Sequence, residues 1–337
     1  MLIKELTELC GVSGDEGAVR TFLKEKITPY ADKITVDTIG NLIALKKGSS
    51  DKKIMLAAHM DEVGFIVSGI NDKGYIEFKT VGGIDTRVML SKRVLVGRNK
   101  IPGVIGIKAI HLQEKSERDS VPKVKDLYID IGADNKEDAE KFVCVGDYIS
   151  FDTKFEMLGK NTFKAKAIDD RAGCAILLEL IKKPVRYDTY FCFTSQEEVG
   201  LRGATVAAHR VNPDACLVLE STSCNDVYEC PEQEYVTSLG KGAAITFMDG
   251  RHIAPRDIFG WLYSAAKEAS IPVQLKRSIS GGNDAGRIHL ARGGVKTISV
   301  SVPTRYLHSP CSVASLEDIE SAMRIGELFL DRIDEVI

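Results

Sequence analysis

The sequence lacks the apolar run of roughly 18 residues that a membrane-spanning helix requires. Its first residues, Met-Leu-Ile-Lys-Glu-Leu, also lack the basic and apolar segments of a secretory signal peptide. We therefore expect a cytoplasmic protein without a membrane partner. The formal net charge is only −3, so no electrostatic argument favours nucleic acid as a partner either.

Paired cysteines are also missing. None of the eight cysteines stands in a C-x-x-C pair, which excludes the spacing of zinc knuckles and of thioredoxin-like redox sites. We interpret most of them as reduced, buried core residues, because free cysteine is among the residue types most often buried.

What the chain does contain is a large apolar fraction arranged in an alternating pattern. Its 337 residues are 44% apolar and exceed the roughly 100 to 200 residues of one typical domain. In residues 1–65 and 163–337, buried strands alternate with helices, which predicts an α/β domain with a mostly parallel mixed sheet flanked by helices. The expected elements after residue 163 are helix 171–182, strand 189–194, helix 201–209, strand 215–219, strand 243–247, helix 256–269, strand 296–302 and a final helix from 315.

Residues 66–162 follow a different pattern. Turn sequences such as Asn71-Asp-Lys-Gly74 and Asn99-Lys100 separate short apolar strands, which is typical of β-hairpins. We therefore predict an all-β domain inserted into the α/β domain.

Local signals are clearest near the N-terminus. Ser13 and Glu16 have the spacing of a capping box, which predicts a helix over 18–27. Residues 33–37 and 42–45 resemble the two strands of a hairpin. The apolar run 54–58 predicts a buried strand that ends directly before His59.

Acidic and histidine side chains follow these expected strands at the point where each strand ends. Ligands of open α/β sheets bind beyond the carboxyl ends of the strands. The residues at these positions are His59, Asp61, Glu197, Glu198, Glu220 and His308, and Asp169 precedes the helix at 171. They form a mixed nitrogen and oxygen set, which suits zinc or a similar divalent ion.

Two metal ions are the natural number for this set. Ions roughly 3.5 to 4 Å apart share a bridging carboxylate, and each takes one imidazole and one further carboxylate. Glu197 remains as the free carboxylate that accepts a proton from water, because adjacent side chains of an extended backbone diverge. Asp61 remains to orient the His59 ring. The five predicted ligands are His59, Asp169, Glu198, Glu220 and His308.

Four motifs carry a family resemblance: Ala58-His-Met-Asp-Glu-Val-Gly64, Lys166-Ala-Ile-Asp-Asp-Arg-Ala-Gly173, Ser195-Gln-Glu-Glu-Val-Gly-Leu-Arg-Gly-Ala204 and Leu307-His-Ser-Pro310. The chain resembles the tetrahedral aminopeptidases, which include glutamyl, deblocking and leucyl aminopeptidases and some members labelled endoglucanases. The resemblance covers essentially the whole chain. It implies a zinc-exopeptidase-like fold with an inserted all-β dimerisation domain, short peptides as substrates, and dimers that assemble into a tetrahedral dodecamer.

The resemblance also implies a role for each matched residue. Asp169 bridges two metal ions, of which His59 and Glu220 bind one while Glu198 and His308 bind the other. Glu197 matches the general base, and Asp61 matches the aspartate that orients His59. The expected metal is zinc, with cobalt and manganese as alternatives, and the implied reaction is hydrolysis of the first peptide bond by metal-activated water.

Two departures leave the specificity open. Many relatives carry Asp where Glu220 stands and Thr where Asn283 stands, in a Gly-rich loop that we expect to border the substrate. Arg251 is a hypothetical partner of an acidic substrate side chain. The roles of Asn283 and Arg251, the physiological metal and the N-terminal side-chain preference are therefore not assigned.

Two other functions compete with the aminopeptidase. An endoglucanase-type glycoside hydrolase would use two carboxylates roughly 5 to 9.5 Å apart without a metal. Here two histidines accompany the acids, and Trp261 is the only tryptophan. A non-catalytic, metal-stabilised peptide-binding protein would close its site with four Cys or His ligands and would have no use for a spare base such as Glu197.

Overall fold

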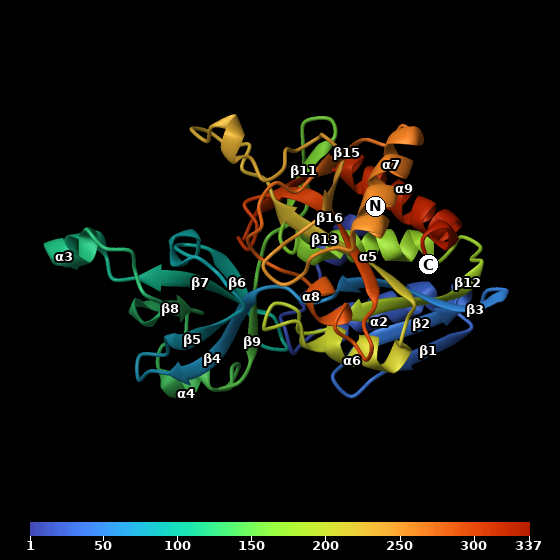
Figure 1. Cartoon of the computed structure of the whole chain (residues 1–337). Helices are drawn as coiled ribbons and strands as arrows, with labels where there is room; N and C mark the ends of the chain where they lie inside the picture. Colours follow the sequence, from blue (N-terminus) through green and yellow to red (C-terminus); the bar gives the residue numbers. More distant parts are fainter.

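The structure is a computed structural model that describes residues 1–337 in two parts (Figure 1). The larger part is a layered α/β body that contains both chain ends, and the smaller part is a closed β-barrel. This is the mixed α/β architecture with a separate β unit that the sequence predicts. No helix combines the length and the apolar character that a membrane crossing needs.

The large sheet has eleven strands and is parallel mainly at its centre. There β12 (Tyr187–Thr194), β3 (Ser50–His59), β13 (Ala215–Ser223) and β16 (Lys296–Arg305) run parallel. The prediction of a mostly parallel sheet is wrong for the flanks, where most strand pairs are antiparallel. The flanking strands are β1 (Lys33–Val36), β2 (Leu42–Lys46), β10 (Glu156–Leu158), β11 (Thr162–Ala165), β14 (Ala243–Thr246), β15 (Val273–Leu275) and β17 (Ser312–Ser315). A short turn joins β1 to β2, whereas the pairs β2–β12, β11–β17 and β14–β16 bring together strands that are distant in the sequence.

Helices cover both faces of this sheet and create two separate apolar cores. Successive side chains of a strand point to opposite faces, so β3 sends Leu56 and Ala58 into one core and Met55 and Ala57 into the other. The second core contains small side chains of α6 (Arg202–Val211) and α8 (Ala285–Ile288). Helices of the first core are α1 (Leu2–Thr7), α2 (Gly17–Ile27), α5 (Ile168–Leu180), α7 (Arg256–Glu268) and α9 (Leu316–Arg332).

The barrel closes in the strand order β4-β5-β8-β7-β6-β9. The Phe65 ring lies at its centre, with ring centroids 5.0 Å from Phe78 and 5.1 Å from Phe151. The segment that contains α3 (Lys115–Arg118) projects away from the rest of the molecule (Figure 1). The barrel strands are β4 (Gly64–Ile70), β5 (Ile76–Val81), β6 (Arg93–Val96), β7 (Ile101–Ile107), β8 (Leu127–Asp130) and β9 (Tyr148–Phe151), with α4 (Lys136–Ala139) before β9. β10, which the sequence assigned to the inserted unit, pairs with β11 in the large sheet.

The capping box predicted at the start of α2 is wrong. The helix begins at Gly17, and no side chain caps it. Ser13 Oγ instead donates a hydrogen bond to Asp61 Oδ2 at 2.6 Å, and Glu16 Oε1 accepts from the Gln196 amide at 3.2 Å. Both side chains therefore serve buried partners from distant parts of the chain in place of their own helix.

The cysteines are divided between core and surface. Burial raises the pKa of the Cys174 and Cys192 thiols, which keeps them protonated and unreactive. Cys144 and Cys311 are exposed. The prediction of buried cysteines is right for half of the eight, namely Cys174, Cys192, Cys216 and Cys224.

A buried ion network joins the N-terminal segment to the end of β3. Lys166 Nζ donates to both Glu62 oxygens at 2.7 Å and to the Leu9 carbonyl at 2.7 Å. Glu62 also accepts from the Gly11 amide at 2.9 Å and lies 3.5 Å from the Arg171 guanidinium. Because all of the charged groups are buried, each depends on the others for compensation.

We predict that Lys166→Met lowers the free energy of unfolding by about 3 kcal/mol, because it leaves the buried Glu62 carboxylate with Arg171 as its only charged partner. The midpoint of thermal unfolding, followed by circular dichroism, should fall. Combining Lys166→Met with Glu62→Gln should recover part of the loss, since the double variant no longer buries that charge. Equal midpoints for the wild type and Lys166→Met would contradict this prediction.

Candidate active site

All seven residues selected from the sequence meet at the carboxyl-terminal edge of the central strands. The parallel register aligns the last residue of β3 with the last residue of β12, so the loops that follow these strands emerge side by side. His59 ends β3, Glu197 and Glu198 follow β12, Glu220 lies in β13, His308 follows β16, Asp61 follows β3, and Asp169 lies at the start of α5.

Asp169 stands between the two histidines and offers one oxygen to each. Its Oδ1 lies 3.1 Å from His59 Nε2, and its Oδ2 lies 3.4 Å from His308 Nε2. Each imidazole has a second carboxylate beside it: Glu220 Oε1 is 3.6 Å from His59 Nε2, and Glu198 Oε2 is 3.3 Å from His308 Nε2. The structure thus brings the five predicted ligands together as two groups that share Asp169.

These distances fit ligands arranged around tetrahedral ions. Bonds of about 2.0 to 2.2 Å give a tetrahedron with edges of about 3.3 to 3.6 Å, and the four pairs here are 3.1 to 3.6 Å apart. Glu220 adds a buried oxygen, Oε2, that has no hydrogen-bond partner, as expected of an oxygen reserved for a cation. Three overlapping groups of acidic and histidine side chains here could hold a metal ion. The mixed donors suit zinc or a similar divalent ion.

The concentration of carboxylates shifts the pKa values of the whole group. Burial raises the pKa of Glu198 to about 7 and raises that of Glu220 well above its ordinary range. Burial alone would lower the pKa of His308, but its hydrogen bond to Asp169 raises it to about 9. The charge of Glu220 likewise overcomes burial and raises the pKa of His59. Metal ions bound among these groups would therefore have to displace protons.

Glu197 and Glu198 are neighbours in sequence but have different surroundings. The Glu198 carboxylate lies against His308, whereas the Glu197 carboxylate forms no hydrogen bond with the protein and lines a cavity of about 870 Å³. Burial raises the pKa of Glu197 well above its ordinary value. A free carboxylate with a raised pKa, next to a cavity, is suited to accept a proton from a bound molecule.

Asp61 contacts both His59 and the two glutamates. The nearest acceptor to His59 Nδ1 is the main-chain oxygen of Asp61 at 3.0 Å, while the carboxylate that the sequence argument selected is 3.5 Å away. That carboxylate accepts hydrogen bonds from the Glu197 amide at 3.0 Å and the Glu198 amide at 3.1 Å. The Asp61 carboxylate therefore holds the backbone of the two glutamates through shorter contacts than the one it makes with the ring of His59.

The residues after Asp169 tie the start of α5 to the end of β3. Asp169 and Asp170 depart from helical dihedral angles, so the regular part of α5 begins at Arg171. Asp170 accepts from the Gly173 amide at 3.0 Å and from the His59 amide at 3.2 Å. Arg171 donates to the Met60 carbonyl at 2.8 Å. The start of the helix and the end of β3 are therefore held together.

The cavity wall includes residues that the sequence argument missed. Lys276 and Arg287 line it together with Arg251 and Asn283, which the sequence had left unassigned. Asn283 Oδ1 accepts from the Ala285 amide at 3.0 Å and from Ser299 Oγ at 3.2 Å, so this side chain supports the Gly-rich loop. No motif or spacing connects Lys276 with the metal ligands, which is why inspection of the sequence did not select it.

Comparisons with known proteins give the family. A model of the family described as M42 glutamyl aminopeptidase matches residues 40–325. A presumed aminopeptidase from Acetivibrio thermocellus is 41% identical over 326 residues, 96% of each chain. An aminopeptidase from the archaeon Desulfurococcus kamchatkensis superposes with a TM-score of 0.94 at 38% identity, covering 98% of this chain and 94% of that one.

Two further structures carry informative descriptions. The TET1 peptidase of Pyrococcus horikoshii, which can assemble into a tetrahedron or a large octahedral shell, has a TM-score of 0.87 at 34% identity, covering 97% of this chain and 98% of that one. An endoglucanase from Thermotoga maritima has a TM-score of 0.82 at 38% identity, covering 98% and 96%.

The family match spans most of the chain, and these relatives align with nearly its full length. The resemblance drawn from the four motifs is thereby confirmed. The M42 family consists of metallopeptidases, and its divalent metal requirement agrees with the donor set described above. The chain belongs to the M42 peptidase family and is a hydrolase of the exopeptidase class, an aminopeptidase.

Proposed function

We propose that each of the two ligand groups holds one divalent metal ion. Zinc is the preferred assignment, and cobalt and manganese are the alternatives. His59 and Glu220 bind one ion, Glu198 and His308 bind the other, and Asp169 bridges them. The positions of the two Asp169 carboxylate oxygens support two ions. Oδ1 lies 3.1 Å from His59 Nε2, and Oδ2 lies 3.4 Å from His308 Nε2. A single ion would need only one of these groups.

The substrates of this site are short peptides, which lose their N-terminal residue. Bound metal ions lower the pKa of a water molecule and polarise the carbonyl of the first peptide bond. Glu197 accepts the proton of that water, because its carboxylate is free and borders the cavity. Its raised pKa lets it hold the proton and then release it to the leaving amine. Asp61 keeps this base in place through the Glu197 amide.

We predict that Glu197→Gln lowers kcat on an aminoacyl anilide by about 10²- to 10⁴-fold, because the amide cannot take up the proton. Metal content, measured by elemental analysis, should stay at the wild-type level, since all five proposed ligands are unchanged.

The exposed Glu137 on α4 offers a matched control, and Glu137→Gln should retain wild-type turnover. Wild-type turnover in Glu197→Gln would remove Glu197 as the base. Loss of metal together with activity would show instead that Glu197 acts as a ligand.

Metal binding should release protons, because His308, with a pKa of about 9, and Glu198, with a pKa of about 7, carry protons near neutral pH in the metal-free protein. Raising the pH from about 6 to about 9 removes these protons in advance, so the apparent affinity for zinc should rise over that range. Calorimetric titrations in buffers of different ionisation enthalpy count the released protons. An affinity that does not change with pH would contradict the assignment of these two residues as ligands.

We further propose that the preferred N-terminal residue is acidic. All acidic residues of the cavity wall belong to the metal centre, whereas Lys276, Arg251 and Arg287 line the rest. Lys276 is the best placed of the three, because it is buried and near enough to Glu220 to feel its charge. Its Nζ donates to the Ser280 carbonyl at 3.1 Å and forms no ion pair with a carboxylate of the protein, although the charge of Asp249 acts on it more strongly than that of Glu220.

We predict that Lys276→Gln lowers the ratio of kcat/KM for a glutamyl anilide to that for a leucyl anilide by about tenfold or more. Arg277→Gln is the matched control, because it removes the same charge one residue along, where the side chain donates to the Glu232 carbonyl and does not line the cavity. A wild type that prefers leucyl or lysyl substrates, or an unchanged ratio in Lys276→Gln, would contradict the acidic preference without affecting the aminopeptidase assignment.

We also propose that the barrel, whose strands run from Gly64 to Phe151, is a dimerisation domain inserted into the catalytic α/β domain. The similarity to the TET1 peptidase supports dimers that assemble into a tetrahedral dodecamer. In the projecting segment, Ile110 is 70% exposed and Leu112 is 61% exposed, so a contact there would bury apolar surface. Degradation of short peptides in the cytoplasm is the process in which we place the enzyme.

Neither alternative function gains support from the site. None of the residues that line the cavity is aromatic, and Trp261 lies on α7, where its Nε1 donates to Glu335. A sugar-stacking platform is therefore missing, despite the similarity to a chain described as an endoglucanase. A non-catalytic peptide-binding role would leave the unpaired, buried Glu197 carboxylate without a purpose.

A further inference from the structure

We call the segment Ser195–Glu198 the carboxylate loop. None of its four main-chain amides donates a hydrogen bond to a main-chain oxygen. Each of its four successive amides donates instead to a side-chain oxygen from elsewhere in the chain. The Ser195 amide donates to Asn41 Oδ1 at 2.9 Å, and the Gln196 amide donates to Glu16 Oε1 at 3.2 Å. The Glu197 and Glu198 amides donate to the two oxygens of Asp61 at 3.0 and 3.1 Å.

The backbone of the carboxylate loop needs this support. Gln196 has a φ of +56°, in the left-handed region that residues with a Cβ atom rarely occupy. This turn lies directly before Glu197 and separates β12 from the two glutamates. A conformation of this kind persists only where surrounding contacts hold it, because the chain relaxes to an extended or right-handed form without them.

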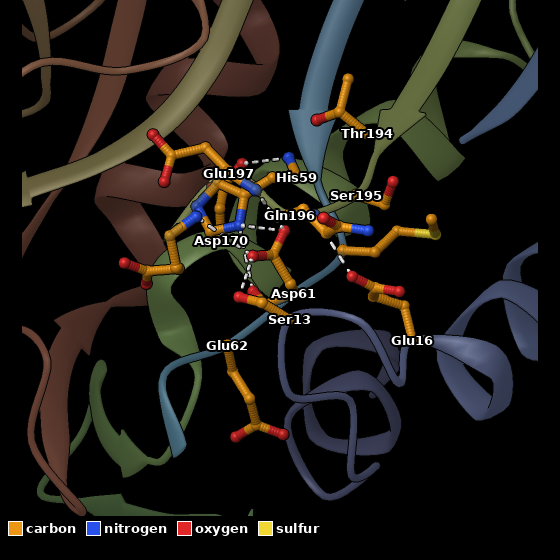
Figure 2. A network of polar contacts seen from close by, with 12 residues as sticks. Ser13, Glu16, His59, Asp61, Glu62, Asp170, Thr194, Ser195, Gln196 and Glu197 are labelled. Atoms are coloured by element: carbon orange, nitrogen blue, oxygen red, sulfur yellow. Dashed lines mark hydrogen bonds and ion pairs between the residues drawn. The ribbon is translucent and has the colours of Figure 1, made fainter. Parts of the chain in front are cut away.

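The partners of these amides come from the N-terminal region, and Figure 2 shows Ser13, Glu16 and Asp61 beside Gln196 and Glu197. Ser13 Oγ donates to Asp61 Oδ2 at 2.6 Å, the same oxygen that receives the Glu198 amide. Glu16 Oε1 also accepts a hydrogen bond from the Gly14 amide at 2.7 Å. This second bond holds the Glu16 carboxylate in the position from which it accepts the Gln196 amide. Ser13 and Glu16 are 4% and 3% exposed, so water does not compete for these bonds.

Helix α2 gains nothing from these two side chains. Glu16 occupies its N-cap position, yet no side chain caps the helix. A capping side chain ordinarily stabilises the start of a helix, so α2 lacks the stability that such a cap would give. The loss is explained if the polar groups of residues 13–16 serve the carboxylate loop.

We infer that Ser13, Glu16 and Asn41 are positioning residues, which hold the carboxylate loop so that Glu197 faces the cavity and Glu198 faces His308. The inference rests on the proposed roles of Glu197 as base and Glu198 as ligand. Neither Ser13 nor Glu16 lines the cavity, so both act through the loop and not on the substrate. Displacement of a reacting group by about 1 Å can cost about 10²-fold in rate, which sets the scale of the expected effect.

The test compares Glu16→Ala with Glu16→Gln and Ser13→Ala with Ser13→Thr. The alanine variants remove a hydrogen-bonding side chain, whereas Gln and Thr keep an oxygen of nearly the same reach. We expect Glu16→Ala to lower kcat on an aminoacyl anilide by about 10- to 100-fold, with KM within about threefold of the wild type. Glu16→Gln and Ser13→Thr should recover most of the rate lost in the matching alanine variant.

Metal content and the midpoint of thermal unfolding are measured on the same samples. The exposed Glu25 on α2 provides the control, and Glu25→Ala should behave as the wild type. Wild-type kcat in Glu16→Ala would overturn the inference. A fall in kcat that only parallels a fall in folded protein, without rescue by Gln or Thr, would also overturn it, because that pattern belongs to a stability role.

Failure of this inference is distinguishable from failure of the proposed function. If the wild type hydrolyses no peptide, or if Glu197→Gln stays active, the proposed function fails regardless of Glu16. If the wild type is active, Glu197→Gln is inactive and Glu16→Ala retains full kcat, the base assignment stands and only the positioning role is lost.

Discussion

The centre of this enzyme depends on the mutual repulsion of carboxylates gathered around Asp169. Glu198 and Glu220 approach the imidazoles on either side of it, within 3.3 and 3.6 Å, and both carboxylate side chains are largely shielded from solvent. Like charges this close interact strongly where the dielectric constant is low, so the metal-free centre relieves the repulsion by holding protons, as the raised pKa values of Glu198, Glu220 and His308 indicate. Divalent ions held by these residues would supply positive charge in place of those protons.

Rigid support is the counterpart of this repulsion. Groups that repel one another would drift apart unless the surrounding backbone were fixed. Asp170 holds the His59 amide, Asp61 holds the amides of both glutamates, and the buried ion network of Lys166, Glu62 and Arg171 anchors the N-terminal segment behind them. Hydrogen bonds and ion pairs of this kind are strong in a low-dielectric interior, so these supports hold the backbone behind the charged side chains.

Sequence inspection found the donors because parallel strands deliver their ends to one edge, a rule that needs no knowledge of register. The same reasoning could not find the supports. Ser13 and Glu16 have the spacing of a helix cap, yet their partners Asp61 and Gln196 lie 48 and 180 residues away, and local spacing carries no record of such contacts. Lys276 follows β15, which joins the sheet only through β14, so its approach to the cavity depends on tertiary packing. The β1–β2 hairpin is local and the sequence predicts it, whereas the antiparallel pairs β2–β12 and β11–β17 join strands far apart in the sequence, which local patterns do not reveal.

The donors are also spread along the chain, from His59 to His308. A ribosome must therefore synthesise nearly the whole polypeptide before the last imidazole emerges, and the barrel strands lie between His59 and Asp169 in the sequence. Unfinished or truncated chains that end before His308 lack one of the proposed metal ligands. An aminopeptidase with donors distributed in this way has no complete centre until its own translation is nearly finished.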